Sequence, residues 1–130
     1  MGEPRIVVRK SAFALTLVTD EGTVRFPVAI GRNPDGADKR DVGDCRTPEG
    51  EFTIESIEDS SEWDDEGARV YGPFFLRLCC PPWEGIGIHG TNDDGLVGRR
   101  TTRGCIRLKN GDLAVLVGRV AVGTRVEILP

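Results

Sequence analysis

Histidine is nearly missing from this sequence, which has 130 residues and a single histidine, His89. Four cysteines are present, but they form no Cys-x-x-Cys pair, and one histidine cannot complete a conventional mixed zinc site with them. We therefore expect no structural metal and no metal cofactor. If the protein uses a histidine in its chemistry, that residue must be His89.

Long apolar runs and basic clusters are also missing. No stretch is long and apolar enough to span a bilayer, and residues 1–5 lead into alternating residues, not into the apolar segment of a secretion signal. The formal net charge is −4 and aromatic residues make up 6% of the chain, which argues against a nucleic-acid-binding surface. We expect no membrane span and no nucleic-acid partner, whereas an anionic carbohydrate or peptide substrate is not excluded.

Glycine and proline are abundant, with 17 and 8 copies, and they divide the chain into short segments. This composition favours many short strands over long helices, and the length fits a single domain, residues 1–130. Asn110 is expected to cap one short C-terminal helix. Alternating apolar residues predict a three-stranded antiparallel meander over residues 5–30 and further strands over residues 51–57, 74–79, 85–89 and 124–128.

Cys105 follows His89 by sixteen positions and is the candidate nucleophile. A cysteine nucleophile needs a base to form its thiolate, and histidine is the usual base. Positive charge on Arg103 and Arg107 favours the thiolate, and Gly104 leaves the approach to the sulfur open. The backbone N–H groups of residues 103–105 are candidates for an oxyanion hole.

The residues alone leave a second interpretation of both side chains. Cys105 can be a small buried apolar residue, and His89 can be a hydrogen-bonded structural residue. The group that would orient the imidazole is also open: Asp93, Asp94 and Asp112 are close in sequence, and a backbone carbonyl would serve equally well.

At this point the sequence resembles a known family. Residues 89–92 (HGTN) and 102–108 (TRGCIRL) resemble the signature of the L,D-transpeptidase catalytic domain, the YkuD-like family, whose pattern is His-Gly-Thr followed by Ser/Thr-His-Gly-Cys. Residues 47–52 (TPEGEF) resemble the family's Thr-Pro-x-Gly-x-Phe segment, and residues 123–128 (GTRVEI) also match. The resemblance covers nearly the whole chain.

The resemblance implies a mostly β fold, a β-sandwich with one short C-terminal helix and long active-site loops. It implies that Cys105 is the nucleophile and His89 its base, and that the Gly90 carbonyl orients the imidazole. Arg103 and Gly104 would form the oxyanion hole. The residues implied in substrate binding are Thr91, Thr102 and Arg107.

The implied reaction is acyl transfer on peptidoglycan peptide stems. The cysteine would attack the L-centre carbonyl of the third residue of a tetrapeptide stem, expel D-alanine and form a thioester. An amine of another stem would resolve the thioester and give a 3→3 crosslink. No metal or organic cofactor is implied. The implied location is the periplasm or cell wall, and since no signal is visible in this chain, we expect that a leader or anchor was removed.

The sequence departs from the family's pattern at one position. The family often has a second histidine two residues before the cysteine, and Arg103 stands there in this chain. Arginine cannot work as a neutral proton shuttle, but its fixed charge can support the thiolate or bind a stem carboxylate.

Three alternative functions are compatible with the same residues. Water in place of the amine would make the site an L,D-carboxypeptidase. A Cys–His amidase or protease acting on other peptides would have no reason to carry the segments at residues 47–52 and 89–92. A catalytically silent wall-binding domain would leave the thiol of Cys105 no more reactive than the other three.

Overall fold

The N-terminal part of the protein forms the expected antiparallel meander. The computed structural model describes residues 3–130. Within the meander, alternate side chains such as Ile6, Leu15 and Leu17 are fully buried, as the period of two along a strand requires. Its strands are β1 (Arg5–Arg9), β2 (Ala14–Thr19) and β3 (Gly22–Pro27).

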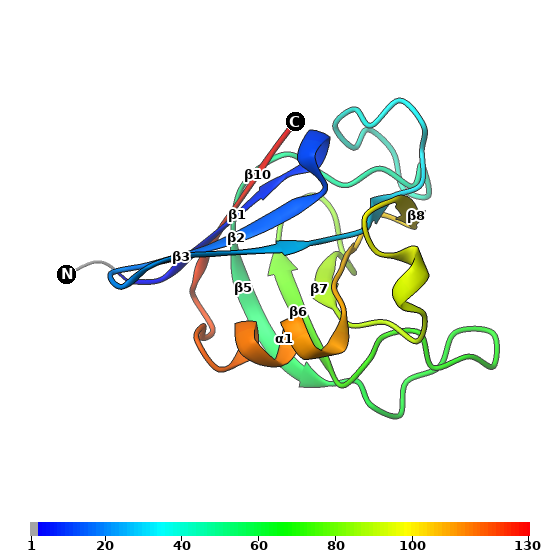
Figure 1. The fold of residues 1–130 in the computed structure, drawn as a ribbon. Helices are drawn as coiled ribbons and strands as arrows, with labels where there is room; N and C mark the ends of the chain where they lie inside the picture. The colour runs from blue at the N-terminus through cyan, green and yellow to red at the C-terminus, as the bar shows by residue number, and fades with distance from the viewer. Residues whose placement is uncertain (1–2) are drawn as a thin grey trace.

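The meander belongs to one eight-stranded sheet with the order β3-β2-β1-β10-β5-β6-β7-β9. The last strand of the chain, β10, runs parallel to β1 and antiparallel to β5, so it joins the meander to the remaining strands. Figure 1 shows the sheet curling, with the meander and the β5–β7 strands on different sides of the interior. The other strands of this sheet are β5 (Gly50–Asp59), β6 (Phe74–Cys79), β7 (Gly87–His89), β9 (Ile106–Arg107) and β10 (Arg125–Leu129).

The smaller elements lie in the connections. A two-stranded parallel sheet consists of β4 (Ile30–Gly31) and β8 (Arg100–Thr102). Two 3-10 helices are η1 (Lys10–Ala12) and η2 (Asp94–Leu96), and the α-helix is α1 (Asn110–Val117). Within residues 3–130, no helix has the length and apolar character that a membrane crossing needs.

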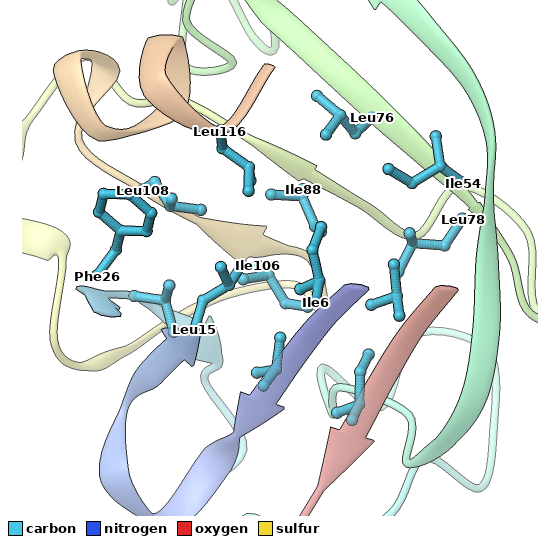
Figure 2. Close-up of a cluster of buried hydrophobic side chains, with 14 of the residues drawn as sticks. Ile6, Leu15, Phe26, Ile54, Leu76, Leu78, Ile88, Ile106, Leu108 and Leu116 are labelled. Carbon is cyan, nitrogen blue, oxygen red and sulfur yellow. The ribbon is translucent and has the colours of Figure 1, made fainter. Parts of the chain in front are cut away.

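The core lies inside the curl of the sheet. Figure 2 shows Leu116 of α1, Ile6 of β1 and Leu76 of β6 directed into the same volume, and all three are fully buried. The expected mostly β fold with one C-terminal helix is confirmed, and its two layers are parts of one continuous curled sheet. Burial of side chains of this kind removes apolar surface from water and is the main stabilising contribution to the fold.

The expected role of Asn110 at the start of α1 is wrong. The cap position is Lys109, which makes no side-chain cap hydrogen bond. The side chain of Asn110 instead accepts a hydrogen bond from the backbone N–H of Thr91 at 2.9 Å. A short side-chain amide can stabilise either a helix end or a neighbouring loop, and here it ties the helix to the segment that follows His89.

Candidate active site

Two adjacent parallel strands bring His89 and Arg107 side by side. The register of β7 on β9 pairs Ile88 with Ile106 and His89 with Arg107. Because side chains alternate along a strand, the two isoleucines face the core and the other pair lies on the opposite face. Cys105 directly precedes β9 and lines the same cavity of about 260 Å³ as His89 and Arg107.

The imidazole of His89 is oriented by a backbone carbonyl. Its Nδ1 lies 2.7 Å from the carbonyl oxygen of Gly90. A carbonyl oxygen only accepts, so Nδ1 carries the proton, and Nε2 of a neutral imidazole has a free lone pair. Among residues 3–130, the hydrogen bond to Gly90 fixes the tautomer of this ring, and none is formed with Asp93, Asp94 or Asp112.

Aromatic rings surround the same imidazole. Phe75, its partner in the β6–β7 register, stacks on His89 with ring centroids 5.7 Å apart and an angle of 11° between the planes. Tyr71 contacts the imidazole in an edge-on arrangement at 5.1 Å, and Trp63 packs against both Tyr71 and Phe75. His89 is 2% exposed as a result. The pKa of His89 is lowered to about 4, mainly by burial and also by the nearby charge of Arg107, while the bond to Gly90 acts in the opposite direction. The side chain is therefore neutral at pH 7, the form that a general base requires.

Glycines make room for this arrangement. A Cβ on Gly87 would lie 2.5 Å from the Phe75 ring, so a larger residue would displace the ring that stacks on His89. A Cβ on Gly90 would collide with Oδ1 of Asn110 and lie 3.1 Å from Cα of Gly72. The sequence predicts a close approach at the glycines of residues 85–89, and the group that approaches Gly87 is the phenyl ring.

The turn before Cys105 is fixed by two threonines. Gly104 has a φ of 136°, a conformation that other residues rarely adopt. Its carbonyl accepts a hydrogen bond from the hydroxyl of Thr47 at 2.9 Å, and its N–H donates to the hydroxyl of Thr102 at 3.1 Å. The Thr102 hydroxyl in turn donates to the Cys105 carbonyl at 2.7 Å. These bonds hold the backbone on both sides of the cysteine Cα.

The surroundings of Cys105 favour the protonated thiol. Its Sγ lies 3.4 Å from the carbonyl oxygen of Gly85, and burial raises the pKa of the thiol. A backbone hydrogen bond from Gly87 and the charges of Arg107, Arg77 and Lys39 act in the opposite direction. The site thus pairs a neutral thiol with a neutral imidazole, in surroundings whose positive charges favour the thiolate once the proton has moved.

A second cavity, of about 230 Å³, meets the first at Cys105 and Arg103, which line both. Lys39 forms part of its wall. The ammonium of Lys39 donates to Asp44 at 2.8 Å and lies 5.3 Å from the centre of the Trp83 ring. The thiol of Cys105 therefore borders both cavities, and so does the exposed guanidinium of Arg103.

Arg107 and Thr91, both expected at a substrate, have different surroundings. Arg107 lines the first cavity, is only 8% exposed, and its Nε is buried without a hydrogen-bond partner among the described residues. Thr91 is buried beside the cavity and is not part of its wall; its hydroxyl donates to the Asp93 carbonyl at 3.0 Å. Thr91 thus shapes the loop after the histidine.

Several residues of this cavity were not predicted from the sequence. Arg32, Asp65, Val70 and Tyr71 come from two connecting segments, and no spacing in the sequence links them to Cys105. The position of Phe75 was predictable, because side chains alternate along the predicted strand. Leu76 faces the core, so Phe75 lies on the opposite face of the sheet, the face that carries His89. Within residues 3–130, no group of three or more His, Cys, Asp or Glu side chains is placed to hold a metal ion.

Comparisons with known proteins identify the family of this chain. A family model described as the L,D-transpeptidase catalytic domain, YkuD, matches residues 3–128. The YkuD protein of Bacillus licheniformis is 32% identical over 127 residues, which cover 97% of this chain and 66% of that protein. The YqjB protein of Bacillus subtilis is 32% identical over 143 residues, covering 98% of this chain and 72% of that protein.

Solved structures share the fold. An L,D-transpeptidase from Mycobacterium smegmatis superposes with a TM-score of 0.75 at 23% identity, covering 98% of this chain and 59% of that chain. The present chain thus spans about two thirds of the length of the Bacillus licheniformis relative and about three fifths of the mycobacterial structure. Since the family model matches almost every residue, this chain belongs to the L,D-transpeptidase catalytic domain family, YkuD.

Proposed function

We propose that this domain is a cysteine-dependent peptidoglycan L,D-transpeptidase. The observation that carries the proposal is the cavity shared by the thiol of Cys105, the neutral imidazole of His89 and the guanidinium of Arg107, whose Nε is buried without a hydrogen-bond partner among the described residues. A nucleophile, a base and a carboxylate-binding group are the parts that acyl transfer from a peptide with a free C-terminus requires.

The proposed first step is acylation of the cysteine. Nε2 of His89 accepts the thiol proton while the sulfur bonds to the L-centre carbonyl of the third residue of a tetrapeptide stem. Breakdown of the tetrahedral intermediate breaks the C–N bond, and the imidazolium gives its proton to the departing amine of D-alanine. The products are a thioester on Cys105 and free D-alanine.

The proposed second step transfers the acyl group to an amine. The amine of another stem attacks the thioester, its proton passes to His89, and the thiolate leaves and is reprotonated. The result is a 3→3 crosslink. Two cavities that meet at the thiol support transfer to an amine, because they provide space for a donor and for an acceptor on either side of it. Neither step requires a metal or an organic cofactor.

The remaining site residues receive supporting roles. The N–H groups of Arg103 and Cys105 are proposed to stabilise the oxyanion. The N–H of Gly104 already donates to Thr102, so Gly104 and Thr102 contribute by shaping the turn. Arg107 is proposed to bind the carboxylate of the departing D-alanine, which would supply the partner that its Nε lacks.

Product analysis tests the proposal. We propose incubating the protein with disaccharide-tetrapeptides and identifying the products by mass spectrometry. Crosslinked dimers that have lost one D-alanine would support transpeptidation, and loss of D-alanine without dimers would support the L,D-carboxypeptidase alternative. Neither product, together with a thiol of Cys105 no more reactive than that of Cys79, would support a silent wall-binding domain. Action in the periplasm or cell wall is part of the same proposal.

A further inference from the structure

A tight turn places a carboxylate in the wall of the first cavity. The backbones of Asp65 and Ala68 exchange two hydrogen bonds, of 2.8 and 3.1 Å. Glu66 and Gly67 between them both have positive φ, 53° and 85°, as in the type I′ turns of two-residue hairpins. The turn therefore fixes where Asp65 lies, and Asp65 forms part of the cavity wall.

This carboxylate is paired with Arg103. Oδ2 of Asp65 lies 2.7 Å from a terminal guanidinium nitrogen of Arg103, whose side chain is 61% exposed. Asp65 is the one carboxylate that lines the cavity, whereas Arg32, Arg103 and Arg107 supply three guanidinium groups. In a chain with a net charge of −4, this local excess of positive charge marks a place for an anionic ligand.

The ion pair between Asp65 and Arg103 can be replaced by a pair between Arg103 and a ligand carboxylate. Exposed ion pairs of this kind contribute little net stability, so an incoming carboxylate can replace Asp65 at small cost. Arg103 stands two residues from Cys105 and borders both cavities. In the proposed reaction, the acyl carbon at the thiol belongs to the third residue of the stem. The side chain of that residue branches from the Cα next to this carbon, so it can extend toward Arg103 in the wall of either cavity.

We propose that Arg103 selects stems whose third residue has a free side-chain carboxylate, and that Asp65 occupies Arg103 while the site is empty. This inference rests on the proposed function. It assigns a specificity to the position where Arg103 replaces the second histidine of the family's pattern. A diamino diacid at the third position provides the required carboxylate, whereas its side-chain amide and lysine do not.

Binding in the absence of turnover tests the inference. In full-length protein with Cys105→Ala, calorimetry would measure Kd for two tetrapeptides with diaminopimelate at the third position, one with the side-chain carboxyl free and one with it amidated. We expect the free acid to bind about fivefold more tightly, a preference that Arg103→Gln removes. Asp65→Asn should tighten binding of the free acid about threefold and leave the amide unchanged, because it removes the internal competitor.

Matched variants control for charge and folding. Arg99→Gln and Asp64→Asn change neighbouring exposed residues that do not line either cavity, and they should preserve the preference. Equal weakening of both peptides by Arg103→Gln, or weaker binding of the free acid to Asp65→Asn, would overturn the inference and leave the proposed function standing. If neither peptide binds to any folded variant, the proposed function fails, and the inference fails with it.

Discussion

Thr47 and Gly104 are 57 positions apart in the sequence, and a hydrogen bond of 2.9 Å joins the hydroxyl of the first to the carbonyl of the second. The same hydroxyl accepts a hydrogen bond from the N–H of Gly31 at 2.9 Å. The backbone carbonyl of Thr47 accepts from the buried ammonium of Lys10 at 2.8 Å. Thr47 thus connects the turn before Cys105 to Lys10 of the meander.

Thr47→Val should therefore impair catalysis without touching the cavity. The substitution keeps the shape of the side chain but leaves two buried backbone groups unpaired, which should cost about 1–3 kcal/mol of unfolding free energy. We expect kcat for D-alanine release to fall more than KM rises, since the thiol loses its position. Thr23→Val, on the exposed strand β3, is the control and should change neither quantity. An unchanged kcat in a destabilised Thr47→Val variant would show that Thr47 does not position the thiol of Cys105.

Gly87→Ala should disturb the base through Phe75. The added Cβ would lie 2.5 Å from the phenyl ring and 2.7 Å from the Leu76 carbonyl, so the ring must move off His89. We expect a loss of about 1–3 kcal/mol in unfolding free energy and a lower kcat. Gly111→Ala is the matched control, because a Cβ there meets no atom within 4 Å. Denaturant unfolding and turnover assays measure both effects.

The stability of the protein should depend on pH through His89. Burial lowers the pKa of this group to about 4 from an ordinary 6.5, so between these values the unfolded chain binds the proton and the folded protein does not. The stabilisation is fully present above pH 6.5 and is lost as the pH falls toward 4. Between pH 6.5 and 5 the slope should approach about 1.4 kcal/mol per pH unit. Unfolding of His89→Gln in the same range should lack this slope; an equal slope in the variant would assign it to other groups.

Replacing Arg107 should weaken substrate binding without destabilising the fold. Its guanidinium is buried, its Nε has no partner among residues 3–130, and burial lowers its pKa. Arg107→Gln removes a costly buried charge, so the free energy of unfolding should stay level or rise, whereas KM for the tetrapeptide should increase about tenfold or more. Arg99→Gln is the control for net charge. A large loss of stability in Arg107→Gln would mean that the guanidinium supports the fold instead.

Cys105→Ala should abolish both steps of the reaction. The substitution removes the sulfur that forms the thioester in the proposed reaction, while the hydrogen bonds of the turn are made by backbone groups and by Thr47 and Thr102. We expect an unchanged thermal midpoint and no D-alanine release above background. Cys79→Ala changes an exposed cysteine and should retain turnover. D-alanine release by Cys105→Ala at the rate of the unaltered protein would refute its role as nucleophile.

Local patterns in the sequence predicted the strands well. Alternation in residues 5–30 indicated β1, β2 and β3, because each strand has one face on the core and one on solvent. The helix was predicted correctly at Asn110, but its cap was not, since the amide of Asn110 is used by Thr91 across the fold. A tertiary contact of this kind leaves no local pattern.

The candidate site was predictable only in part. His89 and Cys105 stand out by residue type, and strand register now explains why they share a cavity. The aromatic side chains that keep His89 neutral come from a neighbouring strand and a connecting segment, and Asp65 comes from a turn 38 positions before Arg103. Loop residues of this kind are placed by the whole fold, which periodicity does not encode.

The position of β10 has a consequence for the order of folding. Residues 125–129 are translated after His89 and Cys105, yet they form the strand that joins β1 to β5 in the middle of the sheet. The first pair in this contact, Arg5 with Arg125, spans 120 positions, and pairing at such separation is slow because a long loop must close first. We therefore expect the meander and the site-bearing strands to remain separate on the ribosome until the final strand emerges. Nascent chains that stop before Arg125 should have a thiol and an imidazole but no assembled acyl-transfer site.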